Sequence, residues 1–354
     1  MKPERNKKKV IKIGNVLIGG NNPIAIQAMT KTRTSNVRAT LKQIKRLEDR
    51  GAEIVRLAVN DLAAAKAIRR IKKDARVPLV ADIHFDWRLA VEAIKNGIDK
   101  IRLNPANIAK KDQIKEIVKY AHAAKIPIRI GVNSGSLKNL NKNKSLADNM
   151  VKNALDYIKL IEDLGFDNLV ISLKAADIFE TIQAYRKIST LTNYPLHLGL
   201  TATGLSTQGA IKSAIVLGIL LSEGIGDTIR VSLTTGPEEE VMVAKYILQA
   251  LGLRKFGPEV ISCPTCGRCA INLVKIVRNF ESKLSTVNHQ SLANIKIALM
   301  GCSVNGPGEA KQADMGIAFE KQGTGIFFKK GRPLYKVSAS NCIDQLIKEV
   351  GSSR

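Results

Sequence analysis

Four of the five cysteines in this chain are close in sequence and could bind a metal together. Cys263, Cys266 and Cys269 are each separated by two residues, and Cys302 follows after a long gap. Two thiolates with this separation can bind one metal centre, because a tight turn brings both sulfurs to the same point. A proline and a glycine within the first loop are residues that favour such turns. The spacing therefore predicts a metal site.

Iron is favoured over zinc at this site. A structural zinc ion takes four protein ligands, commonly from two paired motifs. Here there is one cysteine run, and His289, the one histidine in the last third of the chain, has no second histidine at ligand spacing. An iron–sulfur cluster tolerates scattered ligands, and a catalytic cluster can leave one iron without a thiolate. Ordinary buried thiols are the other interpretation, which the spacing disfavours.

The chain before these cysteines alternates short apolar runs with amphipathic stretches. The predicted strands are 24–29, 54–59, 79–83, 100–103, 128–132, 168–173, 196–200 and 228–233. Helical periodicity follows them, for example at 36–50, 62–73 and 146–164. Eight βα units over about 230 residues predict an α/β fold, a (β/α)8 TIM-type barrel whose active site lies at the carboxyl ends of its strands. The alternative is an open doubly wound sheet, but no Gly-x-Gly-x-x-Gly follows the first strand.

One face of the predicted strands becomes polar near each strand end, where residues two apart share a face. The polar residues are Arg56, Asp82, His84, Arg102, Asn104, Arg129, Asn133, Ser172, Lys174, His197, Thr201, Arg230 and Ser232. Four arginines and a lysine converge there with Asp82 as the one evident strand-end acid. Unpaired charge inside a barrel is costly, so these cations need an anionic partner. Arginine presents a fixed fork to phosphate oxygens, and a diphosphate would suit the site.

Two other interpretations of these residues stay open. Each arginine could pair with an acid on a neighbouring loop, although five cations on five strands make this less favoured. A single histidine among strands is more often a hydrogen-bonded core residue than a catalyst. The polar face favours substrate binding for His84 and His197, more than proton transfer.

Composition narrows the functional classes. The chain has 56 basic and 31 acidic residues, a formal charge of +25, which first suggests nucleic-acid binding. The lysines are spread along helices, and aromatic residues make up only 4%, too few for a base-stacking surface. No signal peptide and no membrane-spanning run is predicted. Few, clustered cysteines are typical of a reducing cytoplasm.

A domain boundary is predicted near 254–258, dividing the chain into a barrel (1–255) and a smaller α+β domain (256–354) that carries the cysteines. In the second domain the sequence predicts a helix at 270–284 and a closing helix from Asn341. Its predicted strands are 295–300, 316–319, 325–329 and 334–337, the first of which would position Cys302.

Motifs along almost the whole chain resemble the 4-hydroxy-3-methylbut-2-enyl diphosphate synthases of the non-mevalonate isoprenoid pathway (IspG, also called GcpE), in their two-domain bacterial form. The cysteine motifs are Cys-Pro-Thr-Cys (263–266) and Gly-Cys-Ser-Val-Asn-Gly-Pro-Gly-Glu-Ala (301–310). Barrel motifs include Ala-Asp-Ile-His-Phe-Asp (81–86), Ile-Arg-Leu-Asn-Pro-Ala-Asn (101–107) and Pro-Ile-Arg-Ile-Gly-Val-Asn-Ser-Gly-Ser (127–136). Motifs this long, in the right order, are highly specific.

The resemblance implies a [4Fe-4S] cluster bound by Cys263, Cys266, Cys302 and the carboxylate of Glu309, whereas Cys269 has no ligand role. It implies reductive ring opening of 2-C-methyl-D-erythritol 2,4-cyclodiphosphate, with Glu309, Asp82, His84 and Thr201 as catalytic residues. Ser134 joins the substrate-binding residues by its place in a barrel motif. Flavodoxin or ferredoxin would donate electrons. A homodimer is implied, each cluster domain closing the partner's barrel.

The chain departs from the family pattern at one position. The seventh strand of the family typically ends Thr-Glu-Ala-Gly, and the glutamate is thought to assist proton transfer. Here Thr201 is followed by Ala202, Thr203 and Gly204. An alanine cannot donate a proton, so slow turnover is expected.

Two other functions explain part of the sequence. A zinc-stabilised basic RNA-binding protein would explain the charge and the cysteines, but not eight strands with polar ends. A barrel methyltransferase with an electron-transfer cluster would explain both domains. Its cobalamin-type Asp-x-His-x-x-Gly motif is incomplete here, because the Asp-Ile-His at 82–84 lacks the glycine.

Overall fold

The structure is a computed structural model that describes residues 5–137, 140–201, 203–269, 271–284, 295–303, 308, 310–320 and 323–352. The chain divides into two compact units, residues 1–254 and 255–354. Each unit has its own sheets and helices, so the two are described separately.

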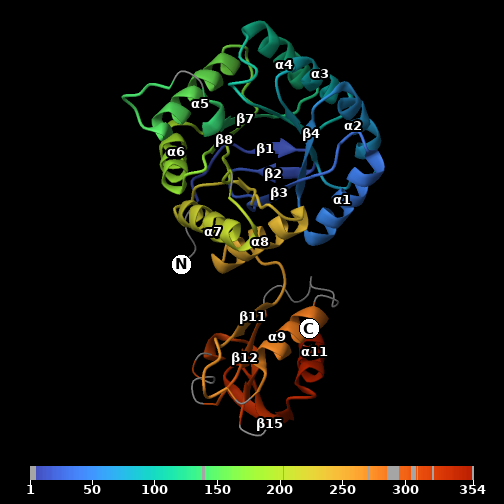
Figure 1. Cartoon of the computed structure of the whole chain (residues 1–354), viewed down its shortest axis with the longest axis vertical. Coiled ribbons are helices and arrows are strands. Elements are labelled where there is room, and N and C mark those ends of the chain that lie inside the picture. Colours follow the sequence, from blue (N-terminus) through green and yellow to red (C-terminus); the bar gives the residue numbers. More distant parts are fainter. Residues whose placement is uncertain are drawn as a thin grey trace. The chain divides into compact units, whose positions relative to one another are not determined.

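The first unit is a ring of parallel strands surrounded by helices (Figure 1). Hydrogen bonding gives the strand order β8-β7-β6-β5-β4-β3-β10-β9, and a parallel bridge from Ile171 in β8 to Leu196, beside β9, links the two ends. This confirms the predicted (β/α)8 barrel. The strands are β3 (Ala25–Met29), β4 (Ile54–Val59), β5 (Leu79–Ile83), β6 (Lys100–Leu103), β7 (Ile128–Asn133), β8 (Leu169–Lys174), β9 (His197–Leu198) and β10 (Thr228–Ile229).

Local sequence sets where the surrounding helices begin. Asn36, Asp61, Asp86 and Asp177 are N-caps whose side chains accept hydrogen bonds from first-turn N–H groups. These caps fix the first turn of each of the four helices that follow them. The helices are α1 (Val37–Arg50), α2 (Leu62–Asp74), α3 (Trp87–Lys95), α4 (Lys111–Ala123), α5 (Leu146–Glu162), α6 (Ile178–Leu191), α7 (Ser206–Ser222) and α8 (Pro237–Ala250).

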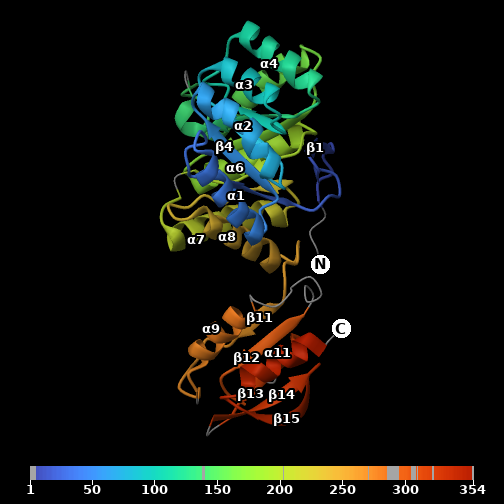
Figure 2. The same ribbon diagram turned by 90° about the vertical axis from the view of Figure 1, so that its right-hand side faces the viewer.

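An antiparallel hairpin of β1 (Ile11–Ile13) and β2 (Val16–Ile18) covers one end of the ring, as the two ribbon views show together (Figures 1 and 2). Ile11, Ile13 and Ile18 are buried against residues at the amino ends of the barrel strands, including Ile54. Burying an isoleucine side chain is worth about 1.5–3 kcal/mol. The hairpin, which the sequence interpretation missed, leaves the carboxyl ends of the strands as the open mouth.

The second unit has a five-stranded sheet in the order β11-β12-β13-β14-β15. Its strands are β11 (Glu259–Ser262), β12 (Lys296–Met300), β13 (Met315–Phe319), β14 (Thr324–Lys329) and β15 (Arg332–Ser338). The first three run parallel, and the last two pair antiparallel. Phe280 of α9 (Leu273–Leu284) and Leu346 of α11 (Cys342–Ser352) share a core with Ile297 and Ile317 of the sheet. The predicted mixed α/β character of this unit is confirmed.

The cysteine loops follow two adjacent strands of that sheet. Ser262 at the end of β11 pairs in parallel with Leu299 of β12, so Cys263 and Cys302 leave the sheet at the same edge. β11 was not predicted, whereas β12 was. Across the part of the chain that is described, no helix is long and apolar enough to cross a membrane.

Candidate active site at the barrel mouth

Polar side chains from seven strands meet in a cavity of about 320 Å³ at the carboxyl ends of the barrel. The lining residues are Arg56, Asp82, His84, Arg102, Arg129, Gly131, Asn133, Ser172, Lys174, Leu200, Thr201, Arg230 and Ser232. Most of the residues that the sequence nominated are therefore brought together. Five lining side chains are basic and one is acidic.

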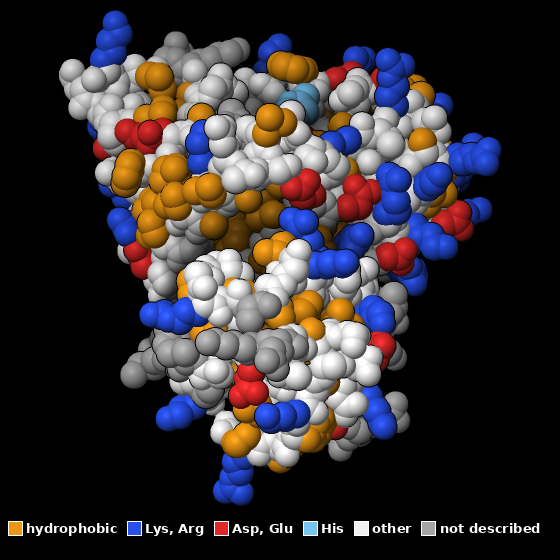
Figure 3. Space-filling view, turned by 60° about the horizontal axis from the view of Figure 1, so that its bottom comes forward, with side chains coloured by type: hydrophobic (Ala, Val, Ile, Leu, Met, Phe, Trp, Pro, Cys, Tyr) orange, Lys and Arg blue, Asp and Glu red, His pale blue; other side chains and the backbone are white. Residues whose placement is uncertain are grey.

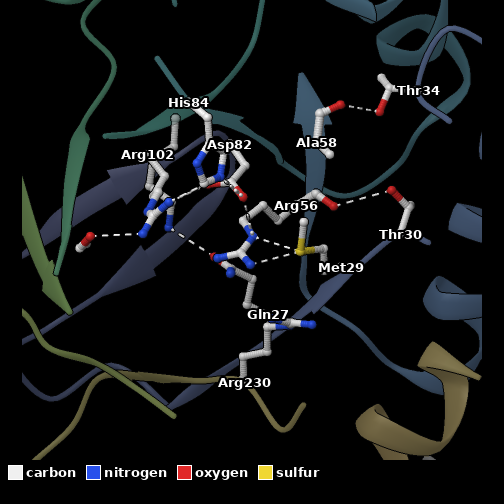
Figure 4. Close-up of polar contacts among 12 residues, drawn as sticks. Gln27, Met29, Thr30, Thr34, Arg56, Ala58, Asp82, His84, Arg102 and Arg230 are labelled. Carbon is white, nitrogen blue, oxygen red and sulfur yellow. Dashed lines mark hydrogen bonds and ion pairs between the residues drawn. The ribbon is translucent and has the colours of Figure 1, made fainter. Parts of the chain in front are cut away.

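Asp82 is the centre of the polar network (Figure 4). Its carboxylate lies 3.2 Å from Arg102 Nη1 and 3.8 Å from Arg56 Nε. His84 Nδ1 accepts from the Asn107 amide (3.1 Å), so Nε2 carries the hydrogen and donates to Asp82 Oδ2 (3.3 Å). Burial alone would raise the pKa of Asp82, but Arg56, the His84 hydrogen bond and Arg102 hold it well below its usual range. Asp82 is therefore ionised.

A second acid, which sequence reasoning missed, lies behind the mouth. Glu240 in the first turn of α8 is buried, and its carboxylate is 3.5 Å from Arg230 Nη2 and 3.1 Å from Lys31 Nζ. It also accepts a hydrogen bond from the Leu233 N–H (3.0 Å). Glu240 thus holds Arg230 in place while leaving that guanidinium on the cavity wall. The sequence does contain a signal for this acid. Pro237-Glu-Glu-Glu is typical of a helix start, and it follows the predicted strand that carries Arg230.

Among the cations that line the cavity, Arg129 and Lys174 have the fewest groups that offset their charge. Arg129 is 1% and Lys174 5% exposed. Arg129 Nε and Nη1 and Lys174 Nζ have no hydrogen-bond partner among the described residues. Burial, followed by repulsion from Arg230 and Arg129, lowers the pKa of Lys174 well below its usual value. An anion in the cavity would relieve this excess charge.

A further buried lysine lies deeper in the barrel. Lys100 is fully buried and its Nζ lies 3.4 Å from Gln27 Oε1. Burial, then Arg129 and Arg56, lowers the pKa of Lys100 well below its usual value. Sequence reasoning missed Lys100 because it begins its strand, away from the polar strand ends.

Three nominated residues do not line the cavity. His197 is buried in β9, with Nδ1 2.7 Å from Thr228 Oγ1. Asn104 is buried and donates to Ser136 Oγ (3.0 Å), which ties the loop after β6 to the loop after β7. Ser134 begins the short helix η1 (Ser134–Ser136) at the end of β7.

A larger hollow of about 720 Å³ lies on the other side of the loop after β5. Its charged lining residues are Asp61, Asp86, Arg88, Glu92, Lys95 and Glu116, which are mostly acidic. An anionic ligand is therefore suited to the barrel mouth, not to this hollow.

In the second unit, two cysteine sulfurs lie against Gly301. A Cβ at Gly301 would be 2.5 Å from Cys269 Sγ and 3.4 Å from Cys263 Sγ, so only glycine allows this approach. Cys263 Sγ accepts the Gly301 N–H (3.2 Å), whereas Cys269 Sγ donates to the Ile271 carbonyl (3.3 Å). An acceptor sulfur suits a thiolate ligand, and a donor sulfur suits a free thiol.

The cysteines that follow two adjacent strands are compatible with an iron–sulfur cluster. Within the described residues, no three His, Cys, Asp or Glu side chains are arranged to bind one metal ion. A cubane cluster presents separate irons to its ligands, so the sulfurs need not converge on one point. Cys266 is exposed, while Cys263 and Cys302 are partly buried. An N–H···S bond such as that from Gly301 is among the interactions that tune cluster thiolates.

Family comparison covers both units. The GcpE TIM-barrel domain matches residues 8–245, and the GcpE protein C-terminal domain matches residues 259–352. The chain belongs to the GcpE family. Membership indicates an iron–sulfur enzyme, and it gives no support to the methyltransferase or the RNA-binding alternative.

Curated GcpE relatives match along nearly their entire length. The chain is 51% identical over 350 residues to the 4-hydroxy-3-methylbut-2-en-1-yl diphosphate synthase (flavodoxin) of Fusobacterium nucleatum, covering 98% of this chain and 97% of that protein. Identity to the synthase of the same name from Ruminiclostridium cellulolyticum is also 51%, with 98% of both chains covered. The relatives' name denotes an enzyme that depends on an electron carrier.

Solved structures support the barrel alone. Dihydropteroate synthase from Stenotrophomonas maltophilia is 13% identical, with a TM-score of 0.52, covering 69% of this chain and 98% of that one. The Plasmodium falciparum protein with a dihydropteroate synthase portion has a TM-score of 0.51 at 12% identity, covering 69% of this chain and 50% of that one. At this identity the likeness concerns the fold only.

Two nominated positions, Glu309 and Ala202, lie outside the described residues. Their roles rest on the sequence of this GcpE-family chain.

On the face drawn in Figure 3, basic side chains are interspersed with acidic and apolar ones.

Proposed function

We infer that this GcpE-family enzyme opens 2-C-methyl-D-erythritol 2,4-cyclodiphosphate reductively to 4-hydroxy-3-methylbut-2-enyl diphosphate. The observation that carries this conclusion is the barrel mouth, where five basic side chains surround one acid. A cyclic diphosphate supplies the negative charge that the cavity lacks. The relatives' names give the same product.

The cations have different tasks in binding. The guanidinium groups of Arg56, Arg102 and Arg230 are held by Asp82 or Glu240, so their forks are oriented before the ligand arrives. Arg129 Nε and Nη1 and Lys174 Nζ have no described partner, so these two side chains gain most from the diphosphate. Pre-oriented donors lose little freedom on binding, which favours affinity.

The uncharged and acidic groups would orient the carbon chain of the substrate. Asp82 is ionised and accepts hydrogen bonds only, so it can hold a substrate hydroxyl. His84 is fixed between Asn107 and Asp82 and positions that carboxylate. Thr201, Asn133 and Ser232 line the wall and offer neutral hydrogen-bond partners.

We propose a [4Fe-4S] cluster in the second unit, with Cys263, Cys266, Cys302 and Glu309 as ligands. The cluster would supply the two electrons of the reduction, one at a time. The acceptor geometry of Cys263 and the placement of Cys302 after the neighbouring strand support this set. A carboxylate ligand exchanges more readily than a thiolate.

The partners follow from the same proposal. Flavodoxin, named for the relatives, is the proposed electron donor, with ferredoxin as the alternative. A homodimer in the cytoplasm is proposed as the working unit. The few, clustered cysteines support that compartment.

Arg102→Ala and Arg129→Ala are each expected to weaken cyclodiphosphate binding by about 2–4 kcal/mol, or ~30- to ~1,000-fold. Each substitution removes a guanidinium group that would donate two hydrogen bonds to a phosphate shielded from water. Isothermal titration of each variant against the parent, without reductant, measures the effect.

Arg186→Ala is the matched control, because Arg186 is exposed on α6 and pairs with Glu223, outside the cavity. Its affinity should equal that of the parent. Parental affinity in both cavity variants would move the diphosphate site elsewhere.

A further inference from the structure

Opening the cyclic diphosphate needs a proton as well as electrons. The bond from the tertiary carbon to a ring phosphate oxygen breaks, the hydroxyl on the neighbouring carbon leaves, and a double bond forms between the two carbons. Two electrons come from the reduced electron carrier, and one proton joins the hydroxyl to make water. This inference rests on the proposed function and asks which side chain supplies that proton.

Most groups that line the cavity cannot supply it. Four of the five cations are arginines, which keep their protons in proteins. Asp82 is ionised and has no proton to give. Both ring nitrogens of His84 are engaged, one accepting from Asn107 and the other donating to Asp82. Serine and threonine hydroxyls are far weaker acids. Among the described lining residues, Lys174 remains.

Lys174 lies at the end of β8, and its side chain reaches across to β9. A Cβ at Gly199 would lie 2.5 Å from Lys174 Nζ, so the glycine makes the room that this nitrogen occupies. No described group accepts a hydrogen bond from Nζ. The amine is thus held inside the cavity, and no described group competes for its proton.

The charges around Lys174 are almost all positive. Arg230, Arg129, Arg56 and Arg102 oppose a charge on Lys174, and buried His197 lies close enough to respond to it. Ser172 on the same strand is neutral, and Asp82 is already engaged by Arg56 and Arg102. A proton on this nitrogen is disfavoured until negative charge enters the cavity.

We propose that Lys174 takes up a proton when the cyclic diphosphate binds and delivers that proton to the departing hydroxyl. The phosphate charges neutralise the surrounding arginines and restore the basicity of the amine. Above the lowered pKa of the free enzyme, the lysine is therefore protonated only in the complex, and after proton delivery it takes up a new proton from solvent in the next cycle. Lys174 is then catalytic as well as part of the binding site.

Proton uptake has a defined pH dependence. Below the lowered pKa of Lys174 in the free enzyme, the lysine is already charged and binding takes up no proton. Above that value, and below the higher pKa in the complex, each binding event takes up one proton. Affinity then falls by up to about tenfold per pH unit as pH rises through this window.

Calorimetry of the intact holoenzyme with cyclodiphosphate, without reductant, tests the uptake directly. Titrations in buffers of different ionisation enthalpy across about pH 6–9 should give close to one proton per ligand for the parent at the upper end. Lys174→Arg keeps a charge but no transferable proton, and should bind within a few-fold while taking up none. Lys174→Met keeps a side chain of similar length beside Gly199 but removes the charge. Its complex should take up no proton, and it should bind the cyclodiphosphate more weakly than the parent.

Turnover with a chemical reductant completes the test. The kcat of Lys174→Arg should fall about 100-fold or more, with KM within a few-fold, because a positioned acid contributes ~100- to ~10,000-fold. His84→Gln, the matched variant at the imidazole that lines the same cavity, should retain the proton uptake. Unchanged uptake in both Lys174 variants, or parental kcat in Lys174→Arg, would overturn the assignment. A parent that neither binds nor converts cyclodiphosphate would instead refute the proposed function.

Discussion

Cys302→Ser is expected to abolish cluster binding, whereas Cys269→Ser should leave it intact. Cys302 follows β12 at the edge where Cys263 follows β11, so its loss removes one of the two proposed ligands at adjacent strand ends. Cys269 Sγ donates to the Ile271 carbonyl, a contact that a metal-bound thiolate could not make. Iron and sulfide content per chain, with visible absorption after anaerobic purification, measures the outcome.

Cys342→Ser is the control, because Cys342 lies in the same unit but is not a proposed ligand. It is buried at the start of α11, and its thiol donates a hydrogen bond to the Ala339 carbonyl. It should retain full iron content. Loss of the cluster in Cys269→Ser together with retention in Cys302→Ser would mean that the proposed ligand set is wrong.

Ala202→Glu is expected to raise kcat by about 100-fold or more over the parent. The resemblance to the family pattern implies a glutamate at this position, and an alanine can neither donate nor accept a proton. Cluster content and cyclodiphosphate affinity should stay at parental values, because the cations of the mouth are unchanged. Steady-state turnover with a chemical reductant gives the comparison.

Ala202→Gln separates proton transfer from side-chain size. It should turn over no faster than the parent, since an amide is not an acid at neutral pH. With a carboxyl group at 202, the kcat of Lys174→Arg should also recover. A parent as fast as Ala202→Glu would show that Lys174 alone delivers the proton at the full rate and that a carboxyl group at 202 adds nothing.

The barrel could be predicted from sequence because its strands are short apolar runs separated by strong helix signals. The strands 54–59, 79–83 and 100–103 were predicted with the observed bounds. β9 and β10 are shorter than predicted, since apolar residues continue past the last ladder hydrogen bonds. The hairpin of β1 and β2 was missed, although Gly14-Asn15 between two alternating runs is a hairpin signal.

The converging cations were predictable because strand alternation places residues of one face together in any barrel. What the pattern could not give is which charges are already paired. Glu240 comes from a helix, and the pairing of Arg56 and Arg102 with one carboxylate depends on neighbouring strands. The isolation of Lys174 beside Gly199 likewise depends on packing across β8 and β9.

The cysteine loops were evident from spacing, yet spacing alone nominated Cys269 as well. Local geometry distinguishes the sulfurs, because Cys263 accepts a backbone N–H and Cys269 donates to a carbonyl. Whether a sulfur accepts or donates depends on the path of the backbone around it, for example at Gly301. The sequence spacing of the cysteines does not show that path.

Conversion of the cyclic diphosphate by the cluster-containing protein is the most direct test of the account. Anaerobically purified protein would be incubated with cyclodiphosphate and a chemical reductant, and the products identified by mass spectrometry. We predict slow, reductant-dependent formation of 4-hydroxy-3-methylbut-2-enyl diphosphate. Protein that carries its cluster and binds the cyclodiphosphate, yet forms none of this product over many hours, would contradict it.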